Sequence, residues 1–283
     1  MKNPSPVRAV ESVLSPRTRS SSTPKTSRAW EHLPLPSALR RLLATFRAEV
    51  RTALGSNLDG LYLLGSVLSD DFQPASSDVD LLVITRRPLS RLEGMRVKRM
   101  HRRLARAGAW GRRLEGGYAA RARLRSWGIM GRVPAVARGG VDLTAPNDWT
   151  AENMMALRQA APLLGPPPAS VFPVVSRESL DRALSRYLHS IVHHRPRSPG
   201  EAAAVALNTA RCLYSLQTGR PSTKTEAGIW LGERLTEMEP VLKAALRVHR
   251  GQARAVDRRV LKTRLPLLQR EAVRMRRLLR RGV

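Results

Sequence analysis

The chain has 283 residues, of which 42% are apolar and 4% aromatic, so it is long enough for one large domain or two modest ones with a buried core. Lysine and arginine number 50 against 22 aspartate and glutamate residues, and the net charge of +28 favours anionic partners such as nucleotides or nucleic acid. No apolar stretch approaches the roughly 20 residues of a membrane span, and the single cysteine, Cys212, excludes an internal disulfide and fits a reducing, cytoplasmic compartment.

The N-terminal part of the chain contains two contrasting segments. Residues 1–28 are rich in Ser, Thr, Pro and Arg and have almost no apolar periodicity, so a disordered basic tail is expected. Residues 36–54 then predict an amphipathic helix that Gly55 ends, because the apolar residues fall on one stripe, namely Leu39, Leu42, Leu43, Phe46 and Val50. This helix is expected to cover a sheet that begins at Leu61.

The stretch 61–84 carries the strongest chemical signal. An apolar run over 61–64 indicates a buried strand, and Gly65-Ser66 ends it with a turn whose backbone can approach a phosphate. Eleven residues later, Asp78 and Asp80 begin a second apolar strand and project to the same side of it, since side chains alternate along a strand. Two carboxylates this close repel each other unless a cation lies between them, and Mg²⁺, which prefers oxygen ligands, is the natural cation here.

An ordinary explanation of this stretch is an exposed edge strand with a polar face and a simple turn. The combination of apolar strand, Gly-Ser, spacer and Asp-Val-Asp is more specific than either part, and it resembles the signature of the polymerase-β-like nucleotidyltransferase superfamily. In that superfamily a third carboxylate lies on a strand beside the first two. Order and spacing favour Glu115, on a short strand predicted within 110–120, and Asp142 in Val-Asp-Leu is the alternative.

Between and after these strands the pattern is helical. Ser90 and Glu93 form a capping-box signal for a helix that runs to Gly108. Residues 147–160 predict a helix with Thr150 as N-cap, and the prolines at 166–168 predict a hinge. Further helices are predicted over 177–193, 199–218, 223–236, 240–251 and from 253 onward. The expected fold class is therefore α+β: a mixed-sheet domain with flanking helices over 29–165, and an all-α bundle over 166–283.

A second resemblance lies in this helical part. Residues 203–235, which read AAVALNTARCLYSLQTGRPSTKTEAGIWLGERL, are similar to the C-terminal domain of the aminoglycoside 3''-adenylyltransferases, the spectinomycin and streptomycin resistance enzymes. The upstream LLGPPPASVFPVVSRESL is similar to the domain junction of the same family. The two resemblances together cover about 39–251. They imply an adenylyltransferase that uses ATP and Mg²⁺, and a monomer is expected.

The resemblance implies roles for individual residues. Asp78 and Asp80 would hold Mg²⁺, Glu115 would act as general base, and the nucleotide would meet Gly65, Ser66, Arg211, Lys224 and His249. A lysine in the first turn of a helix opposes the helix dipole, so an anionic ligand would explain Lys224. Arg211 could also be an interhelical ion-pair partner, and Lys224 could be a solvated surface lysine. His249 stands where the family has a tyrosine.

The acceptor is less well indicated than the chemistry. Glu201 matches an acidic position that contacts the cationic antibiotic in the family, but Ser198 to Glu201 is also a capping box with proline at the first helical position. A second acidic position of the family falls near Arg197, which reverses the charge. His189, His193 and His194 lack an accompanying acidic metal motif and are interpreted as surface or interface residues.

The predicted function is transfer of AMP from ATP·Mg²⁺ to a hydroxyl of a small-molecule acceptor, with aminoglycosides as candidates. The alternative is a non-catalytic or nucleic-acid-directed protein of this fold that binds RNA or DNA through its arginine-rich surface. The three clustered acids argue against a protein that only binds nucleic acid, because such a protein does not need clustered acids facing a polyanion.

Overall fold

The computed structural model describes residues 30–126, 133–145 and 156–280, and these residues form two compact units. The first unit contains the described residues up to 174, and the second begins at 175. The tail over 1–28 and Thr150 lie outside the described residues. The division falls after the expected boundary at 165/166, because the short helix α6 (Pro168–Val171) and Phe172 still pack on the first unit's sheet. The proline cluster therefore belongs to the first unit.

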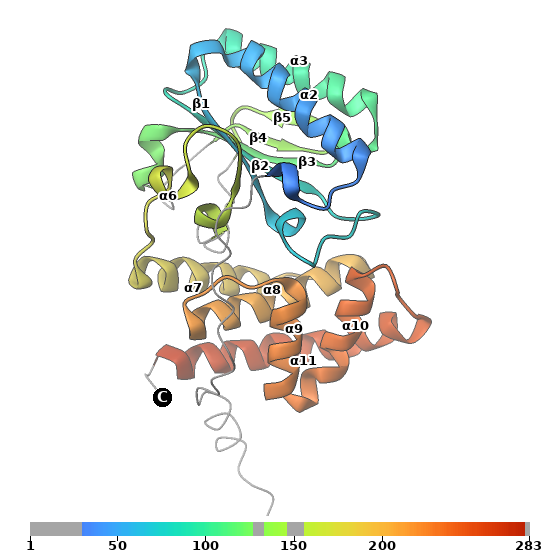
Figure 1. The fold of residues 1–283 in the computed structure, drawn as a ribbon. Coiled ribbons are helices and arrows are strands. Elements are labelled where there is room, and N and C mark those ends of the chain that lie inside the picture. Colours follow the sequence, from blue (N-terminus) through green and yellow to red (C-terminus); the bar gives the residue numbers. More distant parts are fainter. Residues whose placement is uncertain (1–29, 127–132, 146–155, 281–283) are drawn as a thin grey trace, which may run out of the picture. The chain divides into compact units, whose positions relative to one another are not determined.

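A six-stranded mixed sheet forms the centre of the first unit (Figure 1), in the order β5-β4-β3-β2-β1-β6. Strands β2 and β3 are parallel, and all other neighbours are antiparallel. The strand bounds are β1 Leu58–Leu64, β2 Val79–Thr85, β3 Leu114–Ala120, β4 Ala135–Ala137, β5 Gly140–Asp142 and β6 Ala161–Leu164. The α+β class and the predicted strands around Gly65 and Glu115 are confirmed.

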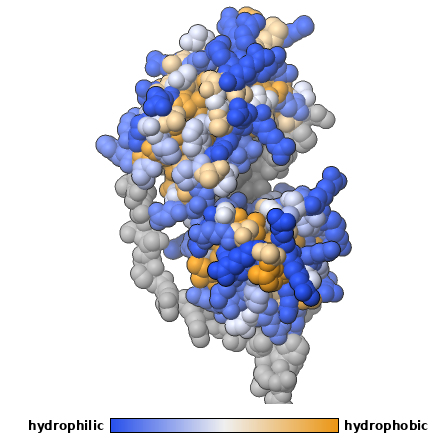
Figure 2. Space-filling model, turned by 90° about the vertical axis from the view of Figure 1, so that its right-hand side faces the viewer, coloured by the Kyte–Doolittle hydropathy of each residue, from blue (hydrophilic) through white to orange (hydrophobic). Residues whose placement is uncertain are grey.

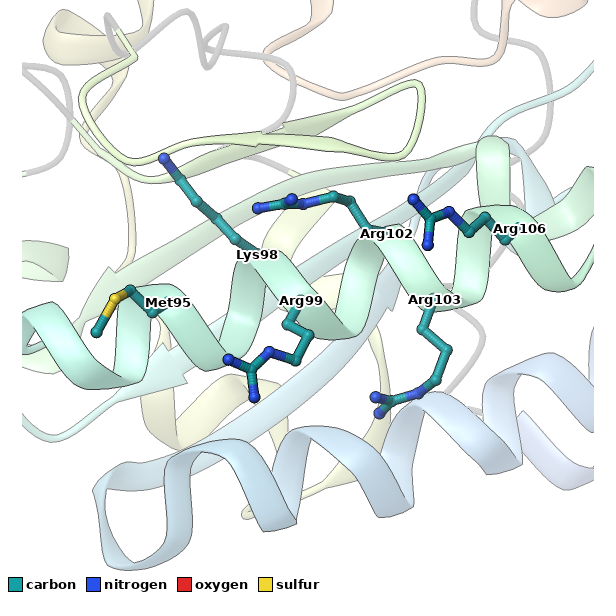
Figure 3. A pocket seen from close by; sticks show the side chains of 6 residues that line it. All are labelled: Met95, Lys98, Arg99, Arg102, Arg103 and Arg106. Carbon is teal, nitrogen blue, oxygen red and sulfur yellow. The ribbon is translucent and has the colours of Figure 1, made fainter.

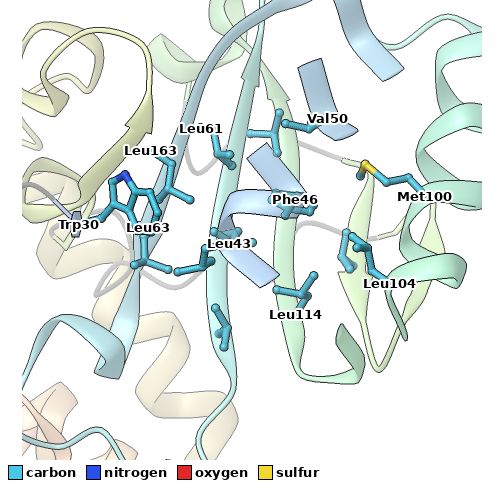
Figure 4. Packing of buried hydrophobic residues seen from close by; sticks show 14 of the residues in the cluster. Trp30, Leu43, Phe46, Val50, Leu61, Leu63, Met100, Leu104, Leu114 and Leu163 are labelled. Carbon is cyan, nitrogen blue, oxygen red and sulfur yellow. The ribbon is translucent and has the colours of Figure 1, made fainter. Parts of the chain in front are cut away.

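Two amphipathic helices cover one face of this sheet (Figure 1). They are α2 (Ser37–Leu54) and α3 (Arg91–Ala107). The α2 stripe packs against alternate residues of β1 and β2, as Figure 4 shows for Leu43, Phe46 and Leu61. The capping box of α3 is formed in both directions: the Ser90 hydroxyl accepts from the Glu93 N–H, and the Glu93 carboxylate accepts from the Ser90 N–H at 2.7 Å. Both helices confirm the sequence prediction.

The opposite face carries a smaller apolar cluster built from the intervening residues of the strands. Tyr62, Leu82 and Ile84 contribute to it, and Phe172 packs edge-on against Tyr62 with 4.9 Å between ring centroids. The short helical elements of this unit are α4 Ala109–Arg112, α6, and the 3-10 turns Trp30–His32, Gly55–Asn57, Gly65–Leu68, Arg121–Ser126 and Leu157–Gln159.

The helix predicted over 147–160 needs correction in its described part. Residues 157–159 form only a 3-10 turn, and 161–164 form the edge strand β6, which pairs antiparallel with β1. The local sequence Ala-Pro-Leu-Leu is too short to distinguish strand from helix, and a proline is tolerated in an edge strand because one side of that strand has no ladder partner. Pairing with β1 decides the outcome.

The described residues of the second unit form five helices. They are α7 Arg177–His193, α8 Pro199–Thr218, α9 Lys224–Arg234, α10 Glu239–His249 and α11 Ala255–Arg280, with a 3-10 turn over Thr236–Met238. Helix α8 contacts each of the other four and carries the largest set of buried residues, including Cys212, whose side chain is fully buried. The predicted bounds of α7 and α8 match the structure. No helix within the described part of the chain is both long and apolar enough to cross a membrane.

Candidate functional site

The sheet register brings Asp80 and Glu115 side by side. Asp80 pairs with Leu64 of β1 on one side and with Glu115 of β3 on the other. Directly paired residues of neighbouring strands point to the same face and are about 5 Å apart. Since Leu64 belongs to the apolar cluster opposite α2 and α3, both carboxylates lie on that second face. Two half-buried carboxylates in this arrangement repel each other unless a cation screens them.

Gly65 lies in contact with the Asp80 carboxylate. Its φ of +74° is in the left-handed region, and a Cβ placed on it would lie 1.9 Å from Oδ2 of Asp80. Glycine is therefore required here both by the backbone conformation and by the closeness of the acid. The turn Gly65–Leu68 begins directly at the end of β1, so the Gly-Ser turn and the acid pair form one cluster, as the sequence predicts.

Asp78 precedes β2 at the end of a loop that is held by Arg113, the residue directly before β3. The Arg113 guanidinium donates to the carbonyls of Pro74 and Ala75, at 2.6 Å each, and lies over the Trp110 ring. The Arg113 carbonyl accepts from the N–H of Val79, directly after Asp78. Asp78 is exposed and lies two residues before Asp80, just outside β2, so its position on the same side as Asp80 stays a prediction. Sequence reasoning does not single out Arg113, because one more arginine in a basic chain carries no signal.

Asp142, the alternative third carboxylate, lies at the edge of the sheet. It ends β5, which is separated from β2 by β3 and β4. Its Oδ1 accepts hydrogen bonds from the N–H and hydroxyl of Thr144, at 2.8 Å and 3.0 Å. The structure thus places Glu115 beside Asp80 and Asp142 two strands farther away.

The donor set at Asp78 and Asp80 consists of carboxylate oxygens, which suit Mg²⁺. No group of three or more His, Cys, Asp or Glu side chains that could hold a metal ion by itself occurs among the described residues. A pair of carboxylates fits an ion that completes its shell with water and substrate phosphates. This fit is chemical, and the metal assignment stays a prediction.

In the second unit, Arg211 and Lys224 both lie near the loop that joins α8 to α9. Lys224 is the first residue of α9, after the N-cap Thr223. Nε of Arg211, on α8, donates to the carbonyl of Ser222 at 3.0 Å, just before that cap. The end of α10 also reaches this region, because Arg250, the neighbour of His249, donates to the Thr225 hydroxyl at 3.4 Å. Their placement gives a cationic region at the start of α9.

Glu201 takes part in the start of α8. Its N–H donates to the Ser198 hydroxyl, and its carboxylate accepts from the N–H of Arg197 at 2.6 Å and from His194 at 2.7 Å. These bonds, first of all the one from the Arg197 backbone, lower the pKa of the Glu201 carboxyl. The predicted capping box is therefore modified: the Glu201 carboxylate accepts from the N–H of Arg197, one residue before the N-cap Ser198, and not from the N–H of Ser198 itself. Nδ1 of His193 donates to the carbonyl of His189, whose ring also contacts the His193 ring, and His194 bonds Glu201. The three histidines therefore have structural partners.

Comparison with known proteins gives two family matches. A model described as a nucleotidyltransferase domain matches residues 43–120, which include Gly65, Asp78, Asp80 and Glu115. A model described as the C-terminal domain of aminoglycoside adenylyltransferase matches residues 170–267. No curated protein sequence matches the chain.

A solved structure is similar over most of the chain. It is spectinomycin adenyltransferase AAD(9) from Enterococcus faecialis with ATP and spectinomycin, with 16% sequence identity, a TM-score of 0.68, and coverage of 84% of this chain and 99% of that chain. At this identity the likeness shows the fold. The two domain matches and the shared fold agree with the division into a mixed-sheet unit and a helical unit.

Proposed function

Because the chain is a nucleotidyltransferase of the aminoglycoside adenylyltransferase type, we propose that it transfers AMP from ATP to a hydroxyl group of a small-molecule acceptor. The observation that carries this proposal is the register of Asp80 with Glu115, directly beside Gly65. An aminoglycoside is the first acceptor class to test, since AAD(9) was solved with ATP and spectinomycin.

Asp78 and Asp80 would hold the metal, on the side of β2 that faces away from α2 and α3. Mg²⁺ bound there would neutralise charge on the phosphate oxygens and would orient the triphosphate. The backbone N–H and hydroxyl of Ser66 are donors at the turn, and Gly65 leaves room for close approach of a phosphate. Arg211, Lys224 and His249 are the proposed nucleotide contacts of the second unit.

Glu115 is the proposed general base. Its carboxylate takes the proton of the acceptor hydroxyl, the acceptor oxygen forms a bond to the α-phosphorus, and the bond to the β-phosphate oxygen breaks. The electron pair of that bond leaves with pyrophosphate, and AMP remains on the acceptor. The protein's contribution in such a reaction is mainly positioning and electrostatic stabilisation, and Arg113 supports it by holding the loop before Asp78.

The acceptor side of the proposal centres on Glu201. Its carboxylate is partly exposed, and its hydrogen bonds from the Arg197 N–H and from His194 lower the pKa of the carboxyl group. A cationic acceptor could be attracted locally, although Arg197 weakens that attraction and the net charge of +28 opposes it at long range. The acceptor panel should therefore include spectinomycin, streptomycin and uncharged polyols.

The test compares carboxylates that differ in position and not in chemistry. With the acceptor of the panel that supports pyrophosphate release in the wild type, Asp80→Asn and Glu115→Gln should each abolish that release from ATP. The circular dichroism spectrum and the unfolding transition of both variants should stay close to wild type. Asp142→Asn is the matched control, two strands beyond β3, and should keep activity. Activity that survives Asp80→Asn would overturn the metal assignment. Loss with Asp142→Asn and survival with Glu115→Gln would make Asp142 the third carboxylate.

A further inference from the structure

The exposed side of α3 is a basic surface that the transfer reaction does not use. The helix carries seven basic residues, and its single acid, Glu93, is buried and paired with Arg87 at 2.9 Å. Hydrophilic residues, deep blue in Figure 2, gather at the top of the first unit, at the height where Figure 1 shows α3. This surface is separate from the acid pair, because α3 covers the other face of the sheet.

The basic side chains surround an open groove of about 520 Å³. Figure 3 shows the residues that line it extending from one helix, namely Met95, Lys98, Arg99, Arg102, Arg103 and Arg106. Arg103 is held by Glu49 of α2 at 2.7 Å. For the other four cations, no ion pair with any described acidic residue occurs. The groove therefore presents four positive charges that no acidic residue in the described part of the chain pairs with.

This arrangement is unfavourable for the isolated helix. Lys98, Arg102 and Arg106 follow one another at intervals of four residues, and like charges at this spacing destabilise a helix. Some exposed cations of α7 and α10 instead have acidic partners one turn away, namely Arg182 with Glu178 and Lys243 with Glu239. An anionic partner on α3 would turn the repulsion into binding energy.

We propose that this face of α3 binds double-stranded nucleic acid through its phosphates. Lys98 to Arg106 span about 12 Å along the helix axis, and a duplex carries one negative charge per about 1.7 Å of its own axis. Single-stranded partners are recognised mainly by stacking on aromatic side chains, and the described residues that line the groove include no aromatic ring. Met95 is the one apolar residue that lines the groove, and of the large apolar residues of α3 only Leu92 and Met95 are exposed while the rest are buried on the sheet, so the helix offers a membrane little apolar surface.

The test is binding without ATP, measured by fluorescence anisotropy with short labelled DNA and RNA duplexes of arbitrary sequence over a range of salt concentrations. The variant Lys98→Gln, Arg99→Gln, Arg102→Gln, Arg106→Gln should bind at least tenfold more weakly, and the slope of log K against log salt should shrink by about three to four, since each phosphate contact contributes about 0.9. The control is Arg258→Gln, Arg259→Gln, Lys262→Gln, Arg264→Gln, which removes the same charge from exposed positions of α11.

The outcomes separate this inference from net charge and from catalysis. A control variant that binds the duplex like wild type supports the proposal, and equal losses in both variants would overturn it. Single strands or anionic vesicles that bind as tightly as the duplex would also overturn it. The α3 variant should keep pyrophosphate release unchanged, because its substitutions lie on the other side of the sheet, so failure of the transfer proposal would be seen separately.

Discussion

Gly65→Ala offers a sharp test of the cluster formed by the Gly-Ser turn and Asp80. A Cβ at Gly65 would lie 1.9 Å from Oδ2 of Asp80, and ordinary van der Waals contact begins near 3.4 Å, so the carboxylate oxygen has to move by about 1.5 Å. The Asp80 side chain therefore has to rotate away from the new methyl group, which moves the carboxylate from its observed position. The alanine also has to adopt a φ near +74°, which costs about 1–2 kcal/mol.

Gly251→Ala is a matched control for the backbone cost. Gly251 has a φ of +71°, and a Cβ there meets no atom within 4 Å. Both variants should therefore lose a similar 1–2 kcal/mol in denaturant unfolding. Only Gly65→Ala should lose transfer activity, by about 100-fold, because a displacement of about 1 Å at a reacting group has that effect.

Pyrophosphate release and equilibrium unfolding, measured on both variants, decide the matter. Equal activity of Gly65→Ala and Gly251→Ala would refute the reasoning, since the Asp80 carboxylate would then not need its observed position. Loss of activity with a much larger loss of stability than in Gly251→Ala would also contradict it, because the clash would then unfold the turn and would not simply move the acid.

Two further predictions concern stability. Burial lowers the pKa of His101 to about 4 from its usual 6.5, so the stability that the neutral side chain contributes is fully present above pH 6.5 and is lost as the pH falls from 6.5 towards 4. The free energy of unfolding should therefore drop by about 2 kcal/mol between about pH 7.5 and pH 5. Urea titration of His101→Gln should show that this drop is removed. Asp257 is fully buried, with Arg247 bonded to its carboxylate, so Asp257→Asn should cost about 3 kcal/mol in urea unfolding. Breaking the exposed pair Lys243–Glu239 with Glu239→Gln should cost less than about 1 kcal/mol, and equal costs would contradict the role of burial.

Local features could be predicted from the sequence because they depend on residues close together in the chain. Capping residues predicted the starts of α3 and α8, since Ser90 and Ser198 each accept a hydrogen bond within one helical turn, and apolar periodicity predicted the bounds of α7. Alternation along a strand predicted Asp78 and Asp80 on one side, and the structure includes Asp80 in β2 and places Asp78 directly before it. These are interactions that a short segment makes with itself.

The rest was decided by pairing between distant segments. Whether Glu115 or Asp142 lies beside Asp80 depends on the order of the strands, and an isolated strand carries no information about which neighbour its backbone will bond. The edge strand β6 exists because β1 offers it hydrogen bonds, and Arg113 matters because a loop 38 and 39 residues away in sequence presents two carbonyls to it. The sequence by itself therefore determined the chemical groups and the local elements, and only the tertiary structure determined which groups meet.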